Sequence, residues 1–511
     1  MAYDYSKLQN GSDIRGIAMD TVLGEAVNLD SEAISRLSKG FLYLLSHNND
    51  KSPTDICIAV GRDSRLSGAD FSNCIAEALI PYGVRVLDAG LASTPAMFMS
   101  TVFEEFRCDG AIMVTASHMP SNRNGMKFFD VNGGLDKGDI TDIITFAESN
   151  SILSNLLPAE EKVLEHIDLM DVYSKHLRTL IVSGINAGEK PLSGLSITVD
   201  AGNGAGGFYA EKVLAPLGAD VSSSQFLEPD GNFPNHIPNP EDKDAIESIC
   251  AAVKKAKTDL GIIFDTDVDR ASAVDENGKE INKNAIVALA AALIAESNPG
   301  TTVVTDSVTS QALSDFLEGK LGLKHLRFKR GYRNVINKAI SLNENGIDSA
   351  LAIETSGHAA YKENFFLDDG AYLATKIVIE AAKCKQAGKG ISSLINDLAE
   401  AVEKTELRLP INGENFSDLA DQIIDGLRES ISAGEVEECA LEEPNYEGVR
   451  INFNRADIKG WMLLRKSLHD PIMPLNFESD VASGCKKIAQ ILVTLLSKYD
   501  ALDIKKLQSM L

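Results

Sequence analysis

The chain has 511 residues, of which 44% are hydrophobic and 24% are charged. These proportions are ordinary for globular proteins and exclude a wholly disordered chain, and at about 100–200 residues per domain the length predicts three or four domains. Asp and Glu number 74 against 49 Lys and Arg, giving a formal net charge of −25. A surface this negative repels nucleic acids and anionic membranes, so we expect neither as a partner.

The seven cysteines form no C-x-x-C pair and no cluster with histidine, which argues against a structural zinc site. Their odd number and wide spacing are typical of reduced thiols in an intracellular compartment. The first residues lack the charged and then apolar pattern of a signal peptide. We therefore expect a cytoplasmic location, or a plastid one if a transit peptide has been removed, and a monomer or weak dimer.

Short β-branched runs alternate with amphipathic patterns over the first three-quarters of the chain. The runs that predict strands are residues 56–60, 84–87, 111–114, 196–199, 260–264, 302–304 and 350–353. The patterns that predict helices include residues 31–45, 72–81 and 283–296. This alternation predicts βαβ units in three blocks of domain size, with mixed or mostly parallel sheets covered by helices.

The pattern changes after residue 405. Alternating runs at residues 448–452, 461–464 and 473–478 predict antiparallel strands, and the apolar face of residues 481–498 predicts a helix. We therefore expect a smaller α+β domain at the end of the chain, with domain boundaries near residues 168, 281 and 405.

A polar cluster directly follows one predicted strand in each of the three blocks: residues 115–118, 265–270 and 354–358. In open α/β sheets, ligands bind at the carboxyl ends of strands. We therefore expect the three clusters to line one shared cleft between domains.

The second cluster contains Asp265, Asp267 and Asp269. In an extended strand these alternating side chains would share one face, and three neighbouring carboxylates repel one another unless a cation neutralises them. Such oxygen ligands select Mg²⁺ or Ca²⁺, and Mg²⁺ usually keeps positions open for phosphate oxygens. The alternative that these residues leave open is an acidic turn exposed to solvent.

Ser117, in the first cluster, has the position of a nucleophile, but taken alone it is better explained as a capping residue. A glycine-rich stretch at residues 202–207 follows another predicted strand. Its spacing, G-x-G-x-G-G, is a weak signal for a dinucleotide loop, and we expect close packing of a turn there instead.

Basic residues lie beside these clusters: Arg15, Lys127, Arg270, Lys329, Arg330, Arg333 and Arg465. An acidic protein that binds a phosphorylated substrate requires this kind of local charge reversal. The placement of the basic residues therefore favours a phosphorylated ligand.

Taken together, these motifs resemble those of the α-D-phosphohexomutase superfamily of phosphoglucomutases and phosphomannomutases. The family's phosphoserine, metal, sugar and phosphate loops resemble, in this order, residues 115–120 with 124–127, 265–270, 354–358 and 465–471. Weaker similarities occur at residues 11–16, 60–65 and 229–231. The motifs come in the family's order and extend over nearly the whole chain.

The resemblance implies an α/β protein with three related mixed-sheet domains around a central cleft and a C-terminal α+β domain similar to the TATA-binding protein. The implied domains are a phosphoserine-loop domain at residues 1–168, a metal-binding domain at 169–280, a sugar-binding domain at 281–405 and a phosphate-binding domain at 406–511. The implied activity is an isomerase that interconverts hexose 1-phosphate and hexose 6-phosphate through a hexose 1,6-bisphosphate, which is also the primer.

By this resemblance Ser117 carries a phosphate, and that phosphate together with Asp265, Asp267 and Asp269 holds one Mg²⁺ per chain. The catalytic residues that it implies are Ser117, Lys127, Arg15, His118, His358 and Arg270. The residues that it implies for binding the hexose phosphate are Glu354, Ser356, Lys329, Arg465, Ser467 and His469.

The phosphate loop departs most from the family pattern, because Lys466, Leu468, His469 and Asp470 stand where Pro, Asn or Gly, Thr and Glu are usual. The loop lacks one hydroxyl donor, for which His469 or Lys466 could substitute. Two alternatives therefore stay open: a catalytically degenerate sugar-phosphate-binding protein, and a haloacid-dehalogenase-like phosphatase with Asp265 as nucleophile. The motifs do not decide between glucose, mannose and N-acetylglucosamine phosphates.

Overall fold

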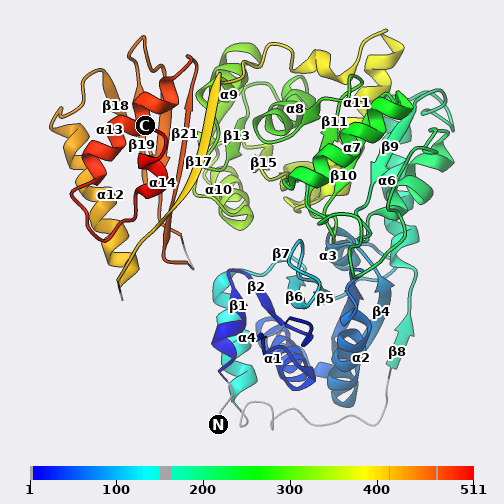
Figure 1. Ribbon diagram of the computed structural model, residues 1–511. Coiled ribbons are helices and arrows are strands. Elements are labelled where there is room, and N and C mark those ends of the chain that lie inside the picture. Colours follow the sequence, from blue (N-terminus) through cyan, green and yellow to red (C-terminus); the bar gives the residue numbers. More distant parts are fainter. Residues whose placement is uncertain (1–3, 23, 150–162, 414, 468–469) are drawn as a thin grey trace. The chain divides into compact units, whose positions relative to one another are not determined.

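The computed structural model describes residues 4–22, 24–149, 163–413, 415–467 and 470–511, and Figure 1 shows its helices and strands. The chain forms two compact units. Unit 1 contains Met1–Leu293 and Ser356–Leu394, and unit 2 contains Ile294–Thr355 and Ile395–Leu511. The chain therefore enters each unit twice.

The first sheet of unit 1 has eight strands in the order β1-β2-β6-β5-β3-β4-β8, with β7 beside β6. Its strands are β1 (Gln9–Asn10), β2 (Asp13–Ile17), β3 (Cys57–Arg62), β4 (Arg85–Leu91), β5 (Gly110–Val114), β6 (Arg123–Asp130), β7 (Gly133–Gly134) and β8 (Val163–His166). Neighbours among β3, β4, β5 and β8 are parallel, whereas β6 is antiparallel to β5 and β2. Every residue of the central strand β5 is buried, as expected for an apolar strand covered on both faces.

Four helices accompany this sheet: α1 (Ser31–Asn49), α2 (Gly68–Leu79), α3 (Thr94–Val102) and α4 (Lys137–Glu148). Asp30 caps α1, because its carboxylate accepts a hydrogen bond from the N–H of Ala33 at 2.9 Å. The ring of Phe41 on α1 lies 5.0 Å from that of Phe128 on β6, centroid to centroid. This shared core holds the strands β5 and β6, which flank the loop that carries Ser117.

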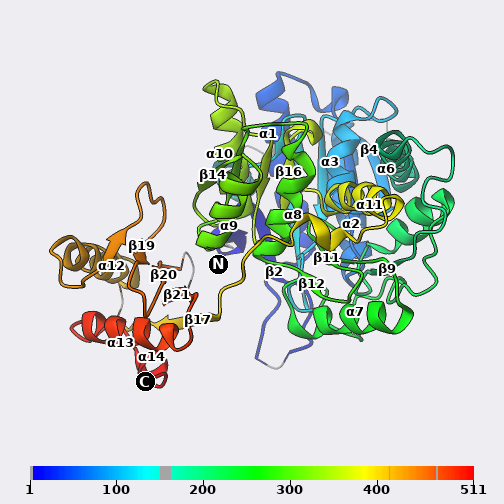
Figure 2. The same cartoon turned by 90° about the horizontal axis from the view of Figure 1, so that it is seen from above.

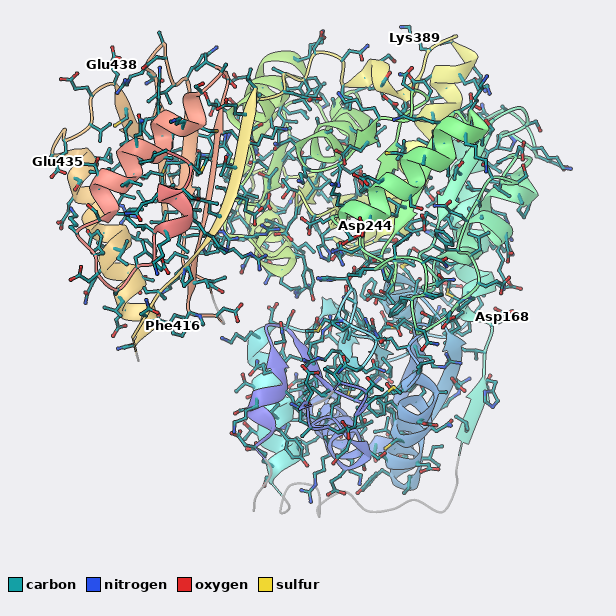
Figure 3. All side chains as sticks on the ribbon, in the orientation of Figure 1. Asp168, Asp244, Lys389, Phe416, Glu435 and Glu438 are labelled. Carbon is teal, nitrogen blue, oxygen red and sulfur yellow. The ribbon has the colours of Figure 1, made fainter. Side chains whose placement is uncertain are left out.

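The second sheet of unit 1 has the order β12-β11-β10-β9. Its strands are β9 (Ile197–Asp200), β10 (Leu260–Phe264), β11 (Ala271–Val274) and β12 (Glu280–Ile281). Unit 1 also contains α6 (Leu169–Ile185), α7 (Lys243–Ala256), β16 (Ala359–Tyr361) and α11 (Gly370–Gln386), and α8 (Asn284–Ala295) leads into unit 2. Two helices of unit 1 have an aspartate at the N-terminus, where a negative charge stabilises a helix. Asp168 caps α6, and Asp244 lies in the first turn of α7 (Figure 3).

Unit 2 contains the parallel strands β13 (Thr302–Thr305), β14 (Lys324–Arg327) and β15 (Leu351–Ile353), with β13 in the middle, and the helices α9 (Gln311–Asp315) and α10 (Tyr332–Glu344). Its C-terminal part is an antiparallel sheet in the order β17-β21-β20-β19-β18. These strands are β17 (Glu403–Pro410), β18 (Cys439–Leu441), β19 (Val449–Phe453), β20 (Gly460–Leu464) and β21 (Ile472–Ser479). Helices α12 (Phe416–Ser432), α13 (Gly484–Leu496) and α14 (Lys505–Gln508) share one apolar core with this sheet (Figure 2).

The structure confirms the predicted α/β class and the change to an antiparallel sheet near the end of the chain. Every predicted strand overlaps an observed strand, because each is an apolar run that becomes buried. Several observed strands were not predicted, among them the very short β1, β12 and β18, since so few residues carry no periodicity. The domain boundaries stay predictions. None of the described helices combines the length and the apolar character that crossing a lipid bilayer requires.

The glycine-rich loop at residues 202–207 packs closely, as predicted, and its neighbour is the acidic turn after β10. The N–H of Ala205 donates to the carbonyl oxygen of Thr266 at 2.8 Å. A Cβ atom added to Gly204 would lie 2.6 Å from the same oxygen and 2.8 Å from Thr266 Cα. Because these are backbone atoms, any larger residue at position 204 must displace the acidic turn.

We expect Gly204→Ala to lower the free energy of unfolding by about 1–3 kcal/mol, the usual cost of overpacking a close contact. Urea unfolding followed by circular dichroism measures the change. Gly138→Ala on α4 is the matched control, because its added Cβ meets open space and an alanine in a helix is favoured by about 0.5–1 kcal/mol. Equal unfolding midpoints for Gly204→Ala and the wild type would contradict the predicted overpacking.

Candidate active site

Ser117 lies in the loop after β5, and its backbone is left-handed, with a φ of 47°. Its N–H donates a hydrogen bond to Thr115 Oγ1 at 2.8 Å. A residue with a side chain keeps this conformation only where its surroundings hold it. No described helix begins at this serine, so the capping explanation does not apply.

The Oγ atom of Ser117 lies among polar groups from the second sheet of unit 1. It donates to Asp265 Oδ2 at 3.0 Å and accepts from Arg270 Nη2 at 3.2 Å. Nδ1 of His118 lies 3.3 Å from it. The structure thus brings together the first two of the three predicted clusters, which are about 150 residues apart in the sequence.

Asp265, Asp267 and Asp269, which we call the acidic cluster, are at most 1% exposed. One carboxylate oxygen from each lies within 4.8 Å of the others. The predicted reason for this grouping was wrong: the residues form a turn, in which Val268 has a φ of 67°, and not an extended strand. The turn gathers the carboxylates by folding back, so side-chain alternation plays no part.

The acidic cluster fits a divalent cation. Asp267 Oδ1 and Asp269 Oδ1 are buried and have no hydrogen-bond partner among the described residues. Buried carboxylate oxygens are normally paired or coordinate a metal. Burial and the neighbouring charge of Asp269 raise the pKa of Asp265 well above its ordinary value, so positive charge is needed to keep all three ionised.

Lys127 on β6 supplies part of that positive charge. Its Nζ atom contacts Asp269 in a very short ion pair and lies 3.3 Å from Asp267 Oδ2. Thr94, at the start of α3, donates from its hydroxyl to the same Asp267 oxygen at 2.5 Å. Lys127 on the first sheet and Thr94 on a helix beside it therefore orient the carboxylates of the acidic cluster, which follows strand β10 of the second sheet.

Arg270 and His118 form a second polar contact beside the serine. Arg270 is 1% exposed, and its Nη2 lies 2.7 Å from His118 Nδ1. Burial and the Arg270 charge lower the pKa of His118 to about 3, so its imidazole is neutral near pH 7. His118 therefore accepts a hydrogen bond and helps to hold Arg270 in place.

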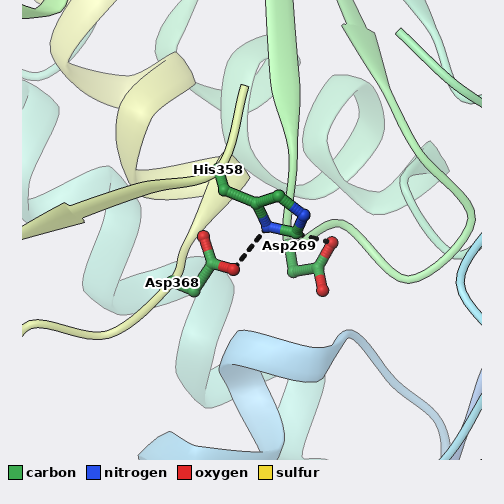
Figure 4. Close-up of side chains that lie close together, drawn as sticks. All are labelled: Asp269, His358 and Asp368. Carbon is green, nitrogen blue, oxygen red and sulfur yellow. Dashed lines mark hydrogen bonds and ion pairs between the residues drawn. The ribbon is translucent and has the colours of Figure 1, made fainter. Parts of the chain in front are cut away.

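His358 touches the acidic cluster from the third predicted motif (Figure 4). Its Nδ1 lies 2.5 Å from Asp368 Oδ2 and 3.9 Å from Asp269 Oδ1. Burial alone would lower the pKa of His358, but these two carboxylates raise it to about 9. Sequence reasoning missed Asp368, whose only signal is an acidic pair shortly after the sugar-like loop.

Arg15 on β2 lies beside the phosphoserine-like loop. Its Nη1 donates to the carbonyl oxygen of Thr115 at 3.2 Å, and its Nη2 pairs with Asp13 at 2.7 Å. The antiparallel pairing of β2 with β6 places Arg15 opposite Gly125. The weak motif at residues 11–16 thus contacts the loop that carries Ser117.

Unit 2 holds most of the predicted substrate-binding residues. Glu354 is buried and accepts a hydrogen bond from the N–H of Gly331 at 2.6 Å. Lys329 is exposed and makes no hydrogen bond or ion pair with a described residue. Ser356 belongs to unit 1 and is 5% exposed.

Of the loop at residues 465–471, which resembles the family's phosphate loop, the structure describes residues 465–467 and 470–471. Arg465 Nη1 lies 4.0 Å from Glu447 Oε1, and Ser467 Oγ accepts from the N–H of Asp470 at 3.3 Å. Lys466 pairs with Asp421 on α12 at 2.6 Å, which argues against its replacing the missing phosphate donor. His469, the other candidate donor, lies outside the described residues.

Comparison with known proteins agrees with these features. Residues 6–151, 171–278 and 282–402 match the phosphoglucomutase/phosphomannomutase α/β/α domains I, II and III. A phosphomannomutase/phosphoglucomutase of Pseudomonas putida is 29% identical over 491 residues, which cover 96% of this chain and 95% of that protein. A phosphoglucomutase of Neisseria gonorrhoeae is also 29% identical, with 93% and 94% covered.

Among solved structures, a phosphoglucomutase/phosphomannomutase family protein from Burkholderia thailandensis has a TM-score of 0.77 and 26% identity. The similarity covers 96% of this chain and 97% of that one. The chain therefore belongs to the phosphoglucomutase/phosphomannomutase family of the α-D-phosphohexomutase superfamily.

If the acidic cluster binds a divalent cation, millimolar Mg²⁺ should raise the thermal unfolding midpoint of the protein relative to EDTA. At 100 times the dissociation constant the gain is about 2.7 kcal/mol. We expect Asp267→Asn to lose most of this gain, because it removes one ligand charge, whereas Asp142→Asn on the exposed surface of α4 keeps it. Differential scanning calorimetry measures both, and equal gains in the two variants would exclude the acidic cluster as the cation site.

Proposed function

We propose that this protein is a Mg²⁺-dependent phosphohexomutase that transfers a phosphoryl group between Ser117 and hexose phosphates. The observation that carries this proposal is the contact of Ser117 Oγ with Asp265 and Arg270, beside buried carboxylates that fit a cation. Hexose 1-phosphate and hexose 6-phosphate are the proposed substrates, and hexose 1,6-bisphosphate is the proposed intermediate and primer.

In the first transfer, the free hydroxyl oxygen of the hexose phosphate attacks the phosphorus carried by Ser117. The new P–O bond forms as the bond from phosphorus to Ser117 Oγ breaks, and the hydroxyl proton passes to a base. The reverse transfer returns the other phosphoryl group of the bisphosphate to the serine. Such transfer proceeds through a loose transition state, so alignment and charge neutralisation provide most of the catalysis.

Arg270 stabilises the serine oxygen, because its Nη2 already donates to Ser117 Oγ in the free protein. Asp265, Asp267 and Asp269 would hold Mg²⁺, which when bound neutralises charge on the transferring group. Each of these groups acts on the serine side of the transfer.

Lys127 and His358 are the proposed proton-exchanging groups, since both touch the acidic cluster. Asp368 contacts His358 Nδ1 and orients the ring, and the imidazole is the group that we propose exchanges a proton with the sugar hydroxyl. General acid–base catalysis of this kind contributes about 10²–10⁴ in rate. Arg15 orients the loop that carries Ser117, and His118 orients the guanidinium of Arg270.

In unit 2, we propose that Glu354 binds sugar hydroxyls and that Lys329, Arg465 and Ser467 bind the distal phosphate, with Ser356 contributing from unit 1. The exposed Lys329 and the guanidinium of Arg465 supply the positive charge that a phosphate requires. His469 is a further proposed ligand.

A phosphatase with Asp265 as nucleophile receives no support from the geometry. Asp265 Oδ2 accepts hydrogen bonds from Ser117 Oγ and from Nε and Nη2 of Arg270, and the residue is 0% exposed. An oxygen so occupied is a poor nucleophile. Ser117 is the more accessible residue, at 7% exposure.

All seven cysteines are free thiols, which supports a reducing compartment, and we propose a cytoplasmic location. Both glucose and mannose phosphates are proposed substrates, since the relatives that match most of the chain include a phosphoglucomutase and a phosphomannomutase/phosphoglucomutase. A monomer or weak dimer stays a prediction.

We expect Ser117→Ala to abolish the interconversion of glucose 1-phosphate and glucose 6-phosphate, because no oxygen remains to carry the phosphoryl group. Intact mass spectrometry of the wild type incubated with glucose 1,6-bisphosphate should show one added phosphoryl group, and Ser117→Ala should show none. Ser121→Ala, in the same loop, is the control and should keep both properties. Full activity in Ser117→Ala would refute the mechanism.

We expect Arg465→Ala to raise the KM for glucose 1-phosphate about 10- to 100-fold, the equivalent of one charge-assisted hydrogen bond. Lys466→Ala is the control, because Asp421 already holds this lysine and its loss should leave KM unchanged. Initial rates with a coupled assay give both values. Binding of glucose 1-phosphate without turnover by the phosphorylated wild type would instead identify a degenerate binding protein.

A further inference from the structure

Arg65 lies three residues after the end of β3, and the residue is buried, at 1% exposure. Its Nη2 donates to the carbonyl oxygens of Ser117 and Met119 at 2.5 and 2.6 Å. Its Nη1 donates to the carbonyl oxygens of Pro120 and Arg123 at 2.7 and 2.9 Å. One side chain therefore joins four backbone carbonyls of the loop that carries the serine.

Asp63 completes this arrangement. Its Oδ2 lies 3.3 Å from Arg65 Nε and accepts a hydrogen bond from Thr115 Oγ1 at 2.7 Å. The same threonine oxygen accepts the N–H of Ser117 at 2.8 Å. The Asp63–Arg65 pair thus holds Ser117 at two backbone groups. Asp63 holds the N–H of Ser117 through the Thr115 hydroxyl, and Arg65 directly holds the carbonyl oxygen of Ser117.

The segment between β9 and α7 covers the other side of Arg65. The ring of Phe233 lies 5.3 Å from the guanidinium carbon. A Cβ atom added to Gly231 would lie 2.6 Å from Leu66 N and 2.6 Å from Ser64 O, so only glycine fits there. The two weak sequence motifs at residues 60–65 and 229–231 therefore meet at this arginine.

The arrangement has a physical reason. Four carbonyl oxygens that converge in a buried space repel one another, and each needs a donor. The planar guanidinium donates from its two Nη atoms to all four carbonyls and faces the Asp63 charge with Nε, whereas an ammonium has only three donors. Without the guanidinium, the carbonyl oxygen of Ser117 loses its hydrogen bond, and the left-handed backbone of this residue loses part of what holds it.

We propose that Arg65 is a positioning residue for phosphoryl transfer, which sets the conformation of the serine loop so that Ser117 Oγ points at Asp265 and Arg270. The inference rests on the proposed function. Arg65 touches the carbonyl oxygen of Ser117 and not Oγ, so it acts on the reaction only through the backbone.

The test measures the rate at which glucose 1,6-bisphosphate phosphorylates Ser117, by intact mass in single-turnover experiments, together with kcat and KM. We expect Arg65→Lys to lower the phosphorylation rate and kcat about 10²-fold, the cost of a small misplacement of a reacting group. The KM for glucose 1-phosphate should stay near the wild-type value. Arg65→Met should be slower still, because it provides no donor.

Arg450→Lys is the matched control for loss of stability. Arg450 is 2% exposed, donates to the carbonyl oxygen of Ser307 at 3.0 Å and pairs with Glu442 at 2.8 Å. We expect its substitution to lower the urea midpoint while the rate of Ser117 phosphorylation at saturating bisphosphate stays unchanged. A purely stabilising role for Arg65 would produce the same pattern in Arg65→Lys, and that outcome would overturn the proposal.

Thr115→Val provides a second variant in case the Arg65 variants do not fold. It removes the hydroxyl that links Asp63 to the N–H of Ser117 and leaves the guanidinium in place, and we expect the same fall in kcat without a rise in KM. A wild-type rate in this variant would also overturn the proposal. If the wild type itself accepts no phosphoryl group on Ser117, the proposed function fails and the inference falls with it.

Discussion

The arrangement of charged groups in the unit 1 site is governed by three buried carboxylates, whose mutual repulsion must be neutralised. Asp265, Asp267 and Asp269 are removed from water, so each negative charge must be matched within a few ångströms or be lost to protonation. Lys127 and Arg270 provide part of the match in the free protein, and the carboxylate oxygens that accept no hydrogen bond from a described residue are suited to a divalent cation. This requirement explains why so acidic a chain concentrates buried basic residues around these aspartates.

The fold meets the requirement by joining two sheets at their strand ends. The serine loop and Lys127 come from the first sheet, whereas the acidic cluster and Arg270 come from the second. Hydrogen bonds fix the two against each other, as in those that the N–H and the hydroxyl of Thr94 donate to the carbonyl oxygen and the carboxylate of Asp267. Because these contacts involve backbone atoms, the geometry of the serine and the carboxylates is rigidly specified.

The two compact units divide the proposed chemistry between them. The serine, the acidic cluster and the His358–Asp368 pair all belong to unit 1. The phosphate-like loop and Glu354 belong to unit 2. In the proposed mechanism, bond making and breaking at the serine therefore uses groups of unit 1.

The sequence by itself determined the fold class and the positions of about half of the described strands, because these follow from apolar runs. Its motifs at strand ends, by their resemblance to the family, predicted Ser117, the three aspartates and His358 as site residues. Tertiary structure alone decided which groups meet. The turn at Val268, the Asp368 partner of His358 and the four carbonyls around Arg65 depend on contacts between distant segments. A linear pattern records the period of an element, whereas burial and pairing arise only once separate elements pack together.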